Sequence, residues 1–145
     1  MLHICGAGIY CDYYKKMAVD LNIEKNCIFY GHCNRKKVYS VVEQMDFNIS
    51  ASIFECSGVS VQEAMLLGKP LVVTKSGGAN SLVSESTAIV VEKESIDALV
   101  VGLKKMIKEY VKFDEKEIMR YAEKYEINIV TKQYVELYQN IMNQK

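Results

Sequence analysis

The chain has 145 residues, of which half are hydrophobic and a quarter are charged, as expected of a single globular domain. Lysine plus arginine and aspartate plus glutamate each total 18, so the net charge is zero. This balance argues against a basic nucleic-acid interface and against a polybasic face for anionic lipids. No apolar run approaches the roughly 20 residues that cross a bilayer, so we predict no transmembrane segment.

The five cysteines are odd in number and form no Cys-x-x-Cys pair. In the absence of a signal-peptide pattern, they predict reduced thiols and a cytoplasmic protein. His3 and His32 lie near cysteines in the sequence, which raises the question of a zinc site. No pair has the tight ligand spacing of structural zinc sites, so we expect no metal.

Short apolar runs alternate with segments of helical period in the first part of the chain. Strands are predicted at Leu2–Cys5, Cys27–Tyr30 and Phe47–Ser50. The turn Gly6–Gly8 ends the first strand and leads into an amphipathic helix over residues 9–22. We expect its tyrosines to be packing residues with a polar tip. Asn34 is a suitable N-cap for the next helix.

The second part of the chain continues the alternation. Ser60 and Glu63 have the spacing of a capping box, which predicts a helix that opens there and ends at Gly68. Buried strands are predicted at Leu71–Thr74 and Ala88–Val91, with a turn between them at Gly77-Gly78. Ser95 and Asp114 are predicted N-caps of two later helices, and a further helix carries its apolar stripe over residues 134–141.

Strands of four or five residues joined by helices predict parallel pairing through right-handed crossovers. We therefore expect an α/β fold, a Rossmann-like doubly wound parallel sheet of about five strands with helices on both faces and two C-terminal helices. Ligands of such sheets bind beyond the carboxyl ends of the strands. The segments at this edge are Gly6–Gly8, Gly31–Cys33, Ser52–Ser60 and Lys75–Gly78.

The run FNISASIFECSGVSVQEAMLLGKPLVVTKSGG resembles the signature of the large retaining family of GT-B glycosyltransferases known as group 1 or family 4. The shared pattern is strand, serine, glutamate, small-residue loop, Glu-Ala-Met, Gly-x-Pro, strand and Gly-Gly. LHICGAG and CIFYGH are similar to two earlier strands of that family's C-terminal domain, each ending in glycine. The resemblance covers nearly the whole chain and implies one donor-binding domain over residues 1–145.

This resemblance implies roles for the residues at matching positions. Glu55 would be the catalytic residue and would bind hydroxyls of the donor sugar, while Glu63 would hold the ribose hydroxyls. Gly31 and His32 would line the base pocket, mostly through their backbone. The sugar and diphosphate would meet backbone groups of Gly6, Gly8, Ser57, Gly58, Val59 and Ser60. Exposed amides at a helix N-terminus favour such an anionic ligand.

The resemblance also implies that parts of the enzyme lie outside this chain. These are the N-terminal acceptor domain and the first strand of this domain, which in the family usually carries an arginine and a lysine that clamp the diphosphate. The longer parent enzyme would transfer a hexosyl-type sugar from a nucleotide diphosphate to an acceptor hydroxyl, with retention and without a metal. It would lie in the cytoplasm or at the inner membrane face. This chain alone would be inactive.

Other interpretations of the same residues stay open. Glu63 also fits the return arm of a capping box with Ser60, and any of the paired glycines can simply permit a turn. A second functional hypothesis is a stand-alone nucleotide-sugar binding or regulatory module that uses the same crevice without catalysis. A third is an interaction domain that forms a homo-oligomer through the surface left by the missing domain.

Overall fold

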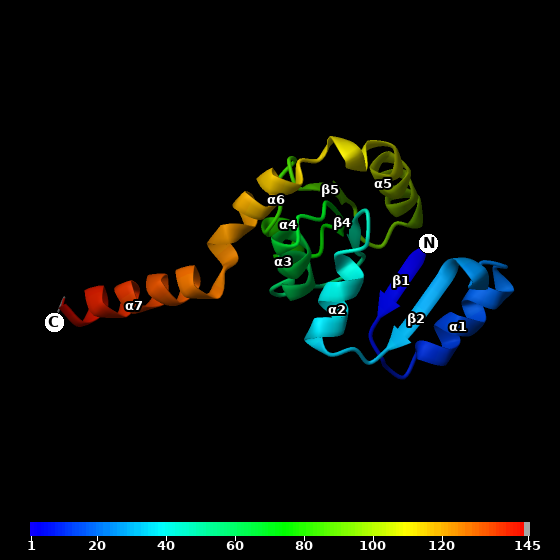
Figure 1. Cartoon of the computed structure of the whole chain (residues 1–145), viewed down its shortest axis with the longest axis horizontal. Helices are drawn as coiled ribbons and strands as arrows, with labels where there is room; N and C mark the ends of the chain where they lie inside the picture. The colour runs from blue at the N-terminus through cyan, green and yellow to red at the C-terminus, as the bar shows by residue number, and fades with distance from the viewer. Residues whose placement is uncertain (144–145) are drawn as a thin grey trace. The chain divides into compact units, whose positions relative to one another are not determined.

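Parallel strands and helices alternate along the chain as the sequence predicts (Figure 1). The computed structural model describes residues 1–143. The chain divides into two compact units, Met1–Gln44 and Met45–Lys145. Each unit contains its own parallel sheet, with two strands in the first unit and three in the second.

The first unit is built around one parallel strand pair. Strand β1 (Leu2–Cys5) pairs with β2 (Cys27–Gly31), and the register shifts by one residue between Ile4 and Cys5. The remaining elements are α1 (Cys11–Asp20), the 3-10 turn η1 (Glu24–Asn26) and α2 (Arg35–Val42). Asn34 caps α2 as predicted, because its side-chain oxygen accepts a hydrogen bond from the Lys37 amide at 2.9 Å.

Different helices lie on the two faces of this strand pair. His3 and Tyr30 point to one face, where His3 Nδ1 lies 2.9 Å from the Tyr30 hydroxyl and Lys37 of α2 lies over the Tyr30 ring. Ile4 and Phe29 point to the other face, which they share with α1. In this unit the only buried hydrophobic residues are Ala18 and Val41. The first unit therefore has a small core.

The second unit is a three-stranded parallel sheet with helices. Strands β3 (Asn48–Ser50), β4 (Leu71–Thr74) and β5 (Ala88–Val91) lie in the order β3-β4-β5. Its helices are α3 (Val59–Leu66), α4 (Gly78–Ser81), α5 (Ile96–Glu109), α6 (Glu115–Ala122) and α7 (Ile127–Asn143), with 3-10 turns η2 (Tyr110–Lys112) and η3 (Glu123–Tyr125). The predicted strands and helices are thus present, with boundaries shifted by one to a few residues.

The core of the second unit lies on both sides of β4, whose four residues are all buried. On one side, Val72 packs with Val91 and with Met106 of α5. On the other, α3 packs against β3 and β4 (Figure 1), and three of its residues are completely buried: Val61, Ala64 and Met65. Helix α6 packs against α3 and adds further buried residues. The sheet is therefore covered on both faces.

Hydrogen bonds between residues close in sequence stabilise the ends of several helices in this unit. Gly68, with φ of 71°, follows α3 and donates to Met65 O, and Lys69 donates to Ala64 O, which is the Schellman pattern. The predicted N-caps are confirmed for the two later helices. Ser95 Oγ accepts from the Ala98 amide at 3.1 Å, and Asp114 Oδ1 accepts from the Lys116 amide at 2.8 Å.

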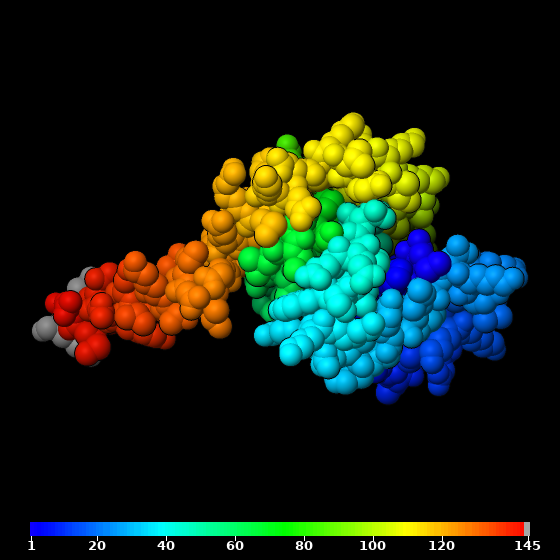
Figure 2. All heavy atoms as spheres, in the orientation of Figure 1, coloured from blue at the N-terminus to red at the C-terminus, as the bar shows by residue number. Residues whose placement is uncertain are grey.

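Helix α7 differs from the other helices because none of its described residues is buried. Figure 2 shows its atoms extending away from the remainder of the second unit. Among the described residues, no helix combines the length and apolar character needed to span a membrane.

The expected single sheet is present as two sheets, although all five strands are parallel as predicted. Among the described residues, hydrogen bonding between strands stops at β1 and at β3, so the two sheets are separate.

We predict that Gly102→Ala destabilises the second unit. Alanine is a better helix former than glycine by about 1 kcal/mol, but the added Cβ would lie 2.5 Å from Val91 Cγ1. Because Val91 is buried against Val72 and Met106, overpacking should cost about 1–3 kcal/mol. Urea denaturation of Gly102→Ala, alone and in a Val91→Ala background, measures the effect. A raised midpoint for the single variant would contradict this account of α5 packing.

Candidate functional site

The loop after β3 is tied to the turn after β4 through the backbone. The Glu55 amide donates to Ser76 O at 2.9 Å, and the Gly78 amide donates to Glu55 O at 2.7 Å. These bonds form an isolated parallel bridge between Glu55 and Gly77. Two segments of the signature, separated by a helix and a strand in the sequence, are therefore held side by side.

This close approach requires glycine at position 78. A Cβ added to Gly78 would overlap the carbonyl group of Cys56 and would lie 2.8 Å from Glu55 O. From the sequence, Gly77-Gly78 predict a turn or a ligand contact, but not a contact with another backbone segment. Gly77 does have a positive φ of 102°, but Gly78 is needed because another backbone segment occupies the space of a side chain. No local pattern in the sequence could have indicated this second role.

Helix α3 begins directly after Gly58. The predicted capping box, in which Ser60 would be the N-cap and Glu63 its partner, is therefore wrong. The N-cap is Gly58, whose φ and ψ of 55° and 44° are left-handed, and Ser60 is the second residue of the helix. A left-handed residue directly before the helix lets the chain turn sharply from the loop into α3. A side chain at this position would also meet Leu82 and Ala79 at 3.0–3.1 Å.

The Glu55 carboxylate takes over part of the capping. Glu55 Oε1 accepts from the Gly58 amide at 3.1 Å and from the Ser57 amide at 3.3 Å. Within the described residues, the next two amides, of Val59 and Ser60, have no backbone or side-chain acceptor. Both residues are exposed. A carboxylate and two unpaired amides thus meet at a helix N-terminus, where the helix dipole favours a negative ligand.

Glu63 lies one turn further along α3 than this N-terminus. Residues at i and i+4 share a helix side, so Glu63 lies below Val59, opposite the side that buries Val61, Ala64 and Met65. Gln62 donates its side-chain amide to Ser57 O at 3.2 Å and so fixes the loop to the helix. The structure therefore brings together six of the predicted residues at one loop–helix junction: Glu55, Ser57, Gly58, Val59, Ser60 and Glu63.

Two further side chains near the Gly77 turn bear on this site. Ser76 is 2% exposed. Its buried hydroxyl has no hydrogen-bond partner among the described residues. The sequence analysis did not single it out, and a serine before Gly-Gly has no distinctive spacing. Lys75 is the cation that follows β4, but its ammonium is paired with Glu92. Both side chains of this pair are more than half exposed, so the pair stabilises little and does not keep Lys75 from a phosphate.

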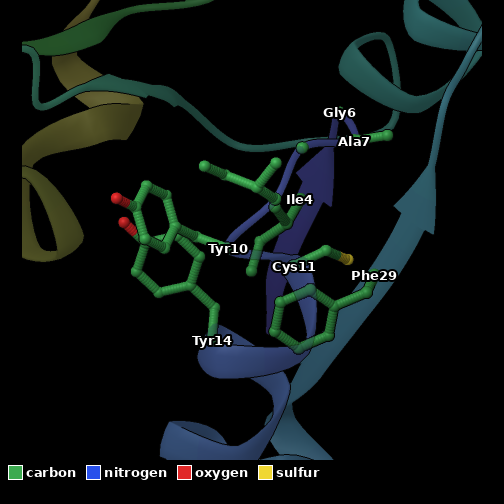
Figure 3. Close-up of a pocket in the computed structure, with 9 residues that line it drawn as sticks. Ile4, Gly6, Ala7, Tyr10, Cys11, Tyr14 and Phe29 are labelled. Atoms are coloured by element: carbon green, nitrogen blue, oxygen red, sulfur yellow. The ribbon is translucent and has the colours of Figure 1, made fainter.

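The other predicted residues belong to the first unit. The turns after β1 and β2 are joined there, because the Gly6 amide donates to Gly31 O at 2.9 Å. Gly31 has a φ of 67°, and His32 is exposed. Gly6 and Gly8 line a pocket of about 350 Å³ whose side chains are mainly aliphatic and aromatic, as Figure 3 shows for Ile4, Tyr10, Tyr14 and Phe29.

Cys5 ends β1, and Cys33 follows β2 by two residues. Burial raises the pKa of the Cys5 thiol, and the neighbouring Cys33 raises it further, so Cys5 stays protonated at neutral pH. The Cys33 thiol points to Gly31 O at 3.6 Å. Across residues 1–143, no three His, Cys, Asp or Glu side chains are grouped so that they could hold a metal ion.

Sequence and structure comparisons give the same family. Residues 1–126 match the family model described as glycosyl transferases group 1. An uncharacterized glycosyltransferase of Methanocaldococcus jannaschii, MJ1607, is 26% identical over 147 residues, which cover 97% of this chain but 37% of that protein. The chain therefore spans little more than a third of this relative's length.

Two solved structures illustrate the likeness in fold. The lipopolysaccharide outer core galactosyltransferase WaaB, in its apo form, gives a TM-score of 0.85 at 23% identity, over 97% of this chain and 40% of that one. Anabaena Alr3699/HepE, in complex with UDP and glucose, gives 0.78 at 22% identity, over 95% and 40%. With the family model spanning most of its length, this chain belongs to the group 1 glycosyltransferases.

Proposed function

We propose that this chain is the donor-binding part of a retaining glycosyltransferase. The parent enzyme moves a hexosyl-type sugar from a nucleotide diphosphate to an acceptor hydroxyl and keeps the anomeric configuration. The observation that carries the proposal is the start of α3, where the Glu55 carboxylate lies beside the unpaired amides of Val59 and Ser60. A sugar diphosphate presents hydroxyls and negative charge, which are the two groups that this junction can bind.

The roles of the two glutamates differ because their surroundings differ. Glu55 Oε1 is used by the loop amides, so Oε2 is the oxygen that accepts bonds from the donor sugar and orients it. Orientation of the reacting sugar contributes to the transfer step more than to affinity. Glu63, one turn along α3, accepts bonds from the ribose hydroxyls.

The diphosphate is placed at the start of α3, where charge develops as the donor bond breaks. Preorganised amides at such a position stabilise the leaving group. Within the first unit, Gly31, His32, Gly6 and Gly8 are proposed to contact the nucleotide. No metal takes part in this proposal. Binding of a nucleotide sugar is supported by the similarity in fold to Anabaena Alr3699/HepE, whose structure contains UDP and glucose.

The chain alone is proposed to bind a donor without transferring its sugar. The cations that clamp the diphosphate are proposed to come from the remainder of the parent enzyme. A stand-alone nucleotide-sugar binding or regulatory module is the second candidate, because the Glu55 junction is complete within this chain. Sugar transfer measured on the full parent protein separates the two candidates, since the second predicts none.

We expect UDP, GDP or ADP to bind at the α3 N-terminus. Cys56 is exposed and lies between Glu55 and Ser57, so bound nucleotide should slow its alkylation by iodoacetamide. Cys27, at the other end of β2 from Gly31, serves as the internal control because its reaction should not change. Peptide mass spectrometry measures both rates. Unchanged Cys56 labelling with all three nucleotides would exclude the site.

We predict that substitutions of the two glutamates affect different parts of the donor: Glu63→Gln lowers affinity for the nucleotide, and Glu55→Gln lowers affinity for the sugar. Glu63→Gln should weaken binding of the free nucleotide about tenfold, because a hydrogen bond to a charged group is worth about 1.5–3 kcal/mol. Glu55→Gln should leave free-nucleotide affinity within about threefold and weaken only the nucleotide sugar. Calorimetric titration of both variants with UDP and a UDP-hexose measures the difference. The reverse pattern would overturn the assigned roles.

We predict that Gly78→Ala disrupts the site and the fold together. The added Cβ overlaps the carbonyl of Cys56, so the Glu55 loop has to move away from the Gly77 turn, at a cost of about 1–3 kcal/mol in unfolding free energy. Gly8→Ala is the matched control, because its Cβ would meet nothing within 4 Å. Urea midpoints compare the two. Equal stability of both variants would show that the backbone contact is dispensable.

A further inference from the structure

Two cysteines of the first unit lie where its two strands end. Cys5 is the last residue of β1, and Cys33 lies two residues beyond the end of β2. In the parallel strand pair, the partner of Cys5 is Gly31. The left-handed φ of 67° at Gly31 turns the chain at this point. Cys33 is therefore only two residues away from the residue that lies beside Cys5.

The carbonyl oxygen of Gly31 contacts the chain around both cysteines. The Gly6 amide, directly after Cys5, donates to Gly31 O at 2.9 Å. The Cys33 thiol points to the same oxygen at 3.6 Å and to Tyr30 O at 4.0 Å. The backbone next to Cys5 and the sulfur of Cys33 thus meet at one atom.

The two thiols also interact with each other. Burial raises the pKa of the Cys5 thiol, the charge and the hydrogen bonding of Cys33 raise it further, and the ammonium of Lys37 on α2 opposes part of this rise. The effects of Cys33 require its sulfur to be near that of Cys5. Both are free cysteines and both are partly exposed. The pair is therefore a reduced dithiol that a small molecule can reach.

A covalent bond at this place would act on a unit that has little other support. The only buried hydrophobic residues of the first unit are Ala18 and Val41. A bond between Cys5 and Cys33 closes a loop that contains α1 and β2. Such a cross-link stabilises a fold mainly by restricting the unfolded chain, and its effect grows with the length of the loop.

We propose that Cys5 and Cys33 form a redox-sensitive site, at which a small-molecule disulfide converts the two thiols into an intramolecular disulfide. This disulfide ties the ends of β1 and β2 together and stabilises the first unit. Oxidised glutathione belongs to the class of oxidant that the reaction needs. In a reducing compartment the pair is reduced at rest, and a disulfide formed there is transient and serves as a sensor.

The reaction consumes one molecule of the oxidant. The Cys33 thiolate attacks one sulfur of the small-molecule disulfide, which forms a mixed disulfide and releases one thiol. Cys5 then attacks Cys33 Sγ, which forms the Cys5–Cys33 bond and releases the second thiol. Two electrons pass from the protein to the oxidant, and the two cysteine protons are balanced by the protons of the two released thiols. Cys33 attacks first, because the raised pKa keeps Cys5 protonated and the thiolate is the reacting form.

The bond would also bear on the proposed donor site. Gly31 and His32, which are proposed to contact the nucleotide, lie in the segment directly before Cys33. An effect of oxidation on donor binding therefore rests on the proposed function, whereas formation of the disulfide does not.

The test incubates the full chain with oxidised glutathione, under native conditions and in concentrated urea, and identifies the disulfides by peptide mass spectrometry. In the native chain, Cys5–Cys33 should exceed every other intramolecular pair at least about tenfold, because the fold raises the effective concentration of these two thiols. Cys11, Cys27 and Cys56 are the internal competitors. In urea the shorter loops Cys5–Cys11 and Cys27–Cys33 should form instead, since they close more easily. No disulfide in the native chain, or a predominant Cys5–Cys11 pair, would overturn the proposal.

Hydrogen exchange tests the effect of the disulfide on the first unit. Amides of β1 and β2 should exchange at least about tenfold more slowly in the oxidised chain than in the reduced chain. Cys33→Ser and, independently, Cys5→Ser should remove this difference, and Cys27→Ser is the matched control that should keep it. Exchange that oxidation leaves unchanged would overturn the stabilising role. Neither readout involves a nucleotide, so failure of donor binding would leave this test unaffected.

Discussion

The candidate site depends on one backbone contact, between the end of the β3 loop and the turn after β4. The Gly78 amide reaches the Glu55 carbonyl, and the Glu55 amide reaches the Ser76 carbonyl. Each such bond contributes only about 0.5–1.5 kcal/mol to stability, but together they fix the position of the Glu55 backbone. From there the Glu55 carboxylate reaches the amides of Ser57 and Gly58 and sets the start of α3. The contact thus links the Gly-Gly pair of the signature to its first glutamate.

A helix N-terminus such as that of α3 favours an anion through dipoles rather than through net charge. The chain is neutral overall, and the cation after β4 is engaged by Glu92. A helix N-terminus contributes about 0.3–1 kcal/mol toward an exposed anion, and the Glu55 carboxylate opposes part of that attraction. The junction is therefore better suited to orienting a ligand than to holding it tightly. Tight binding of the proposed diphosphate requires cations in addition to this junction.

Features with local causes could be predicted from the sequence, and features with non-local causes could not. The strands were predictable from apolar runs, and the caps at Asn34, Ser95 and Asp114 from residue type and spacing. The cap of α3 could not be predicted, because the spacing of Ser60 and Glu63 indicates a capping box that is not formed. The left-handed Gly58 and the Glu55 carboxylate begin the helix instead. The role of Gly78 depends on Cys56, a residue more than twenty positions away. Similarly, helical period predicted the apolar stripe that Tyr10, Tyr14 and Met17 form on α1, but not the exposure of these residues.

The two units differ in how complete their cores are, and this difference bears on function. The second unit buries β4 completely between α3 and α5, so the Glu55 junction rests on a closed core. The first unit buries only Ala18 and Val41 among its hydrophobic residues and exposes the α1 stripe. Chains of about 40 residues rarely bury enough surface to fold alone. A unit of 44 residues with so small a core is therefore only marginally stable by itself.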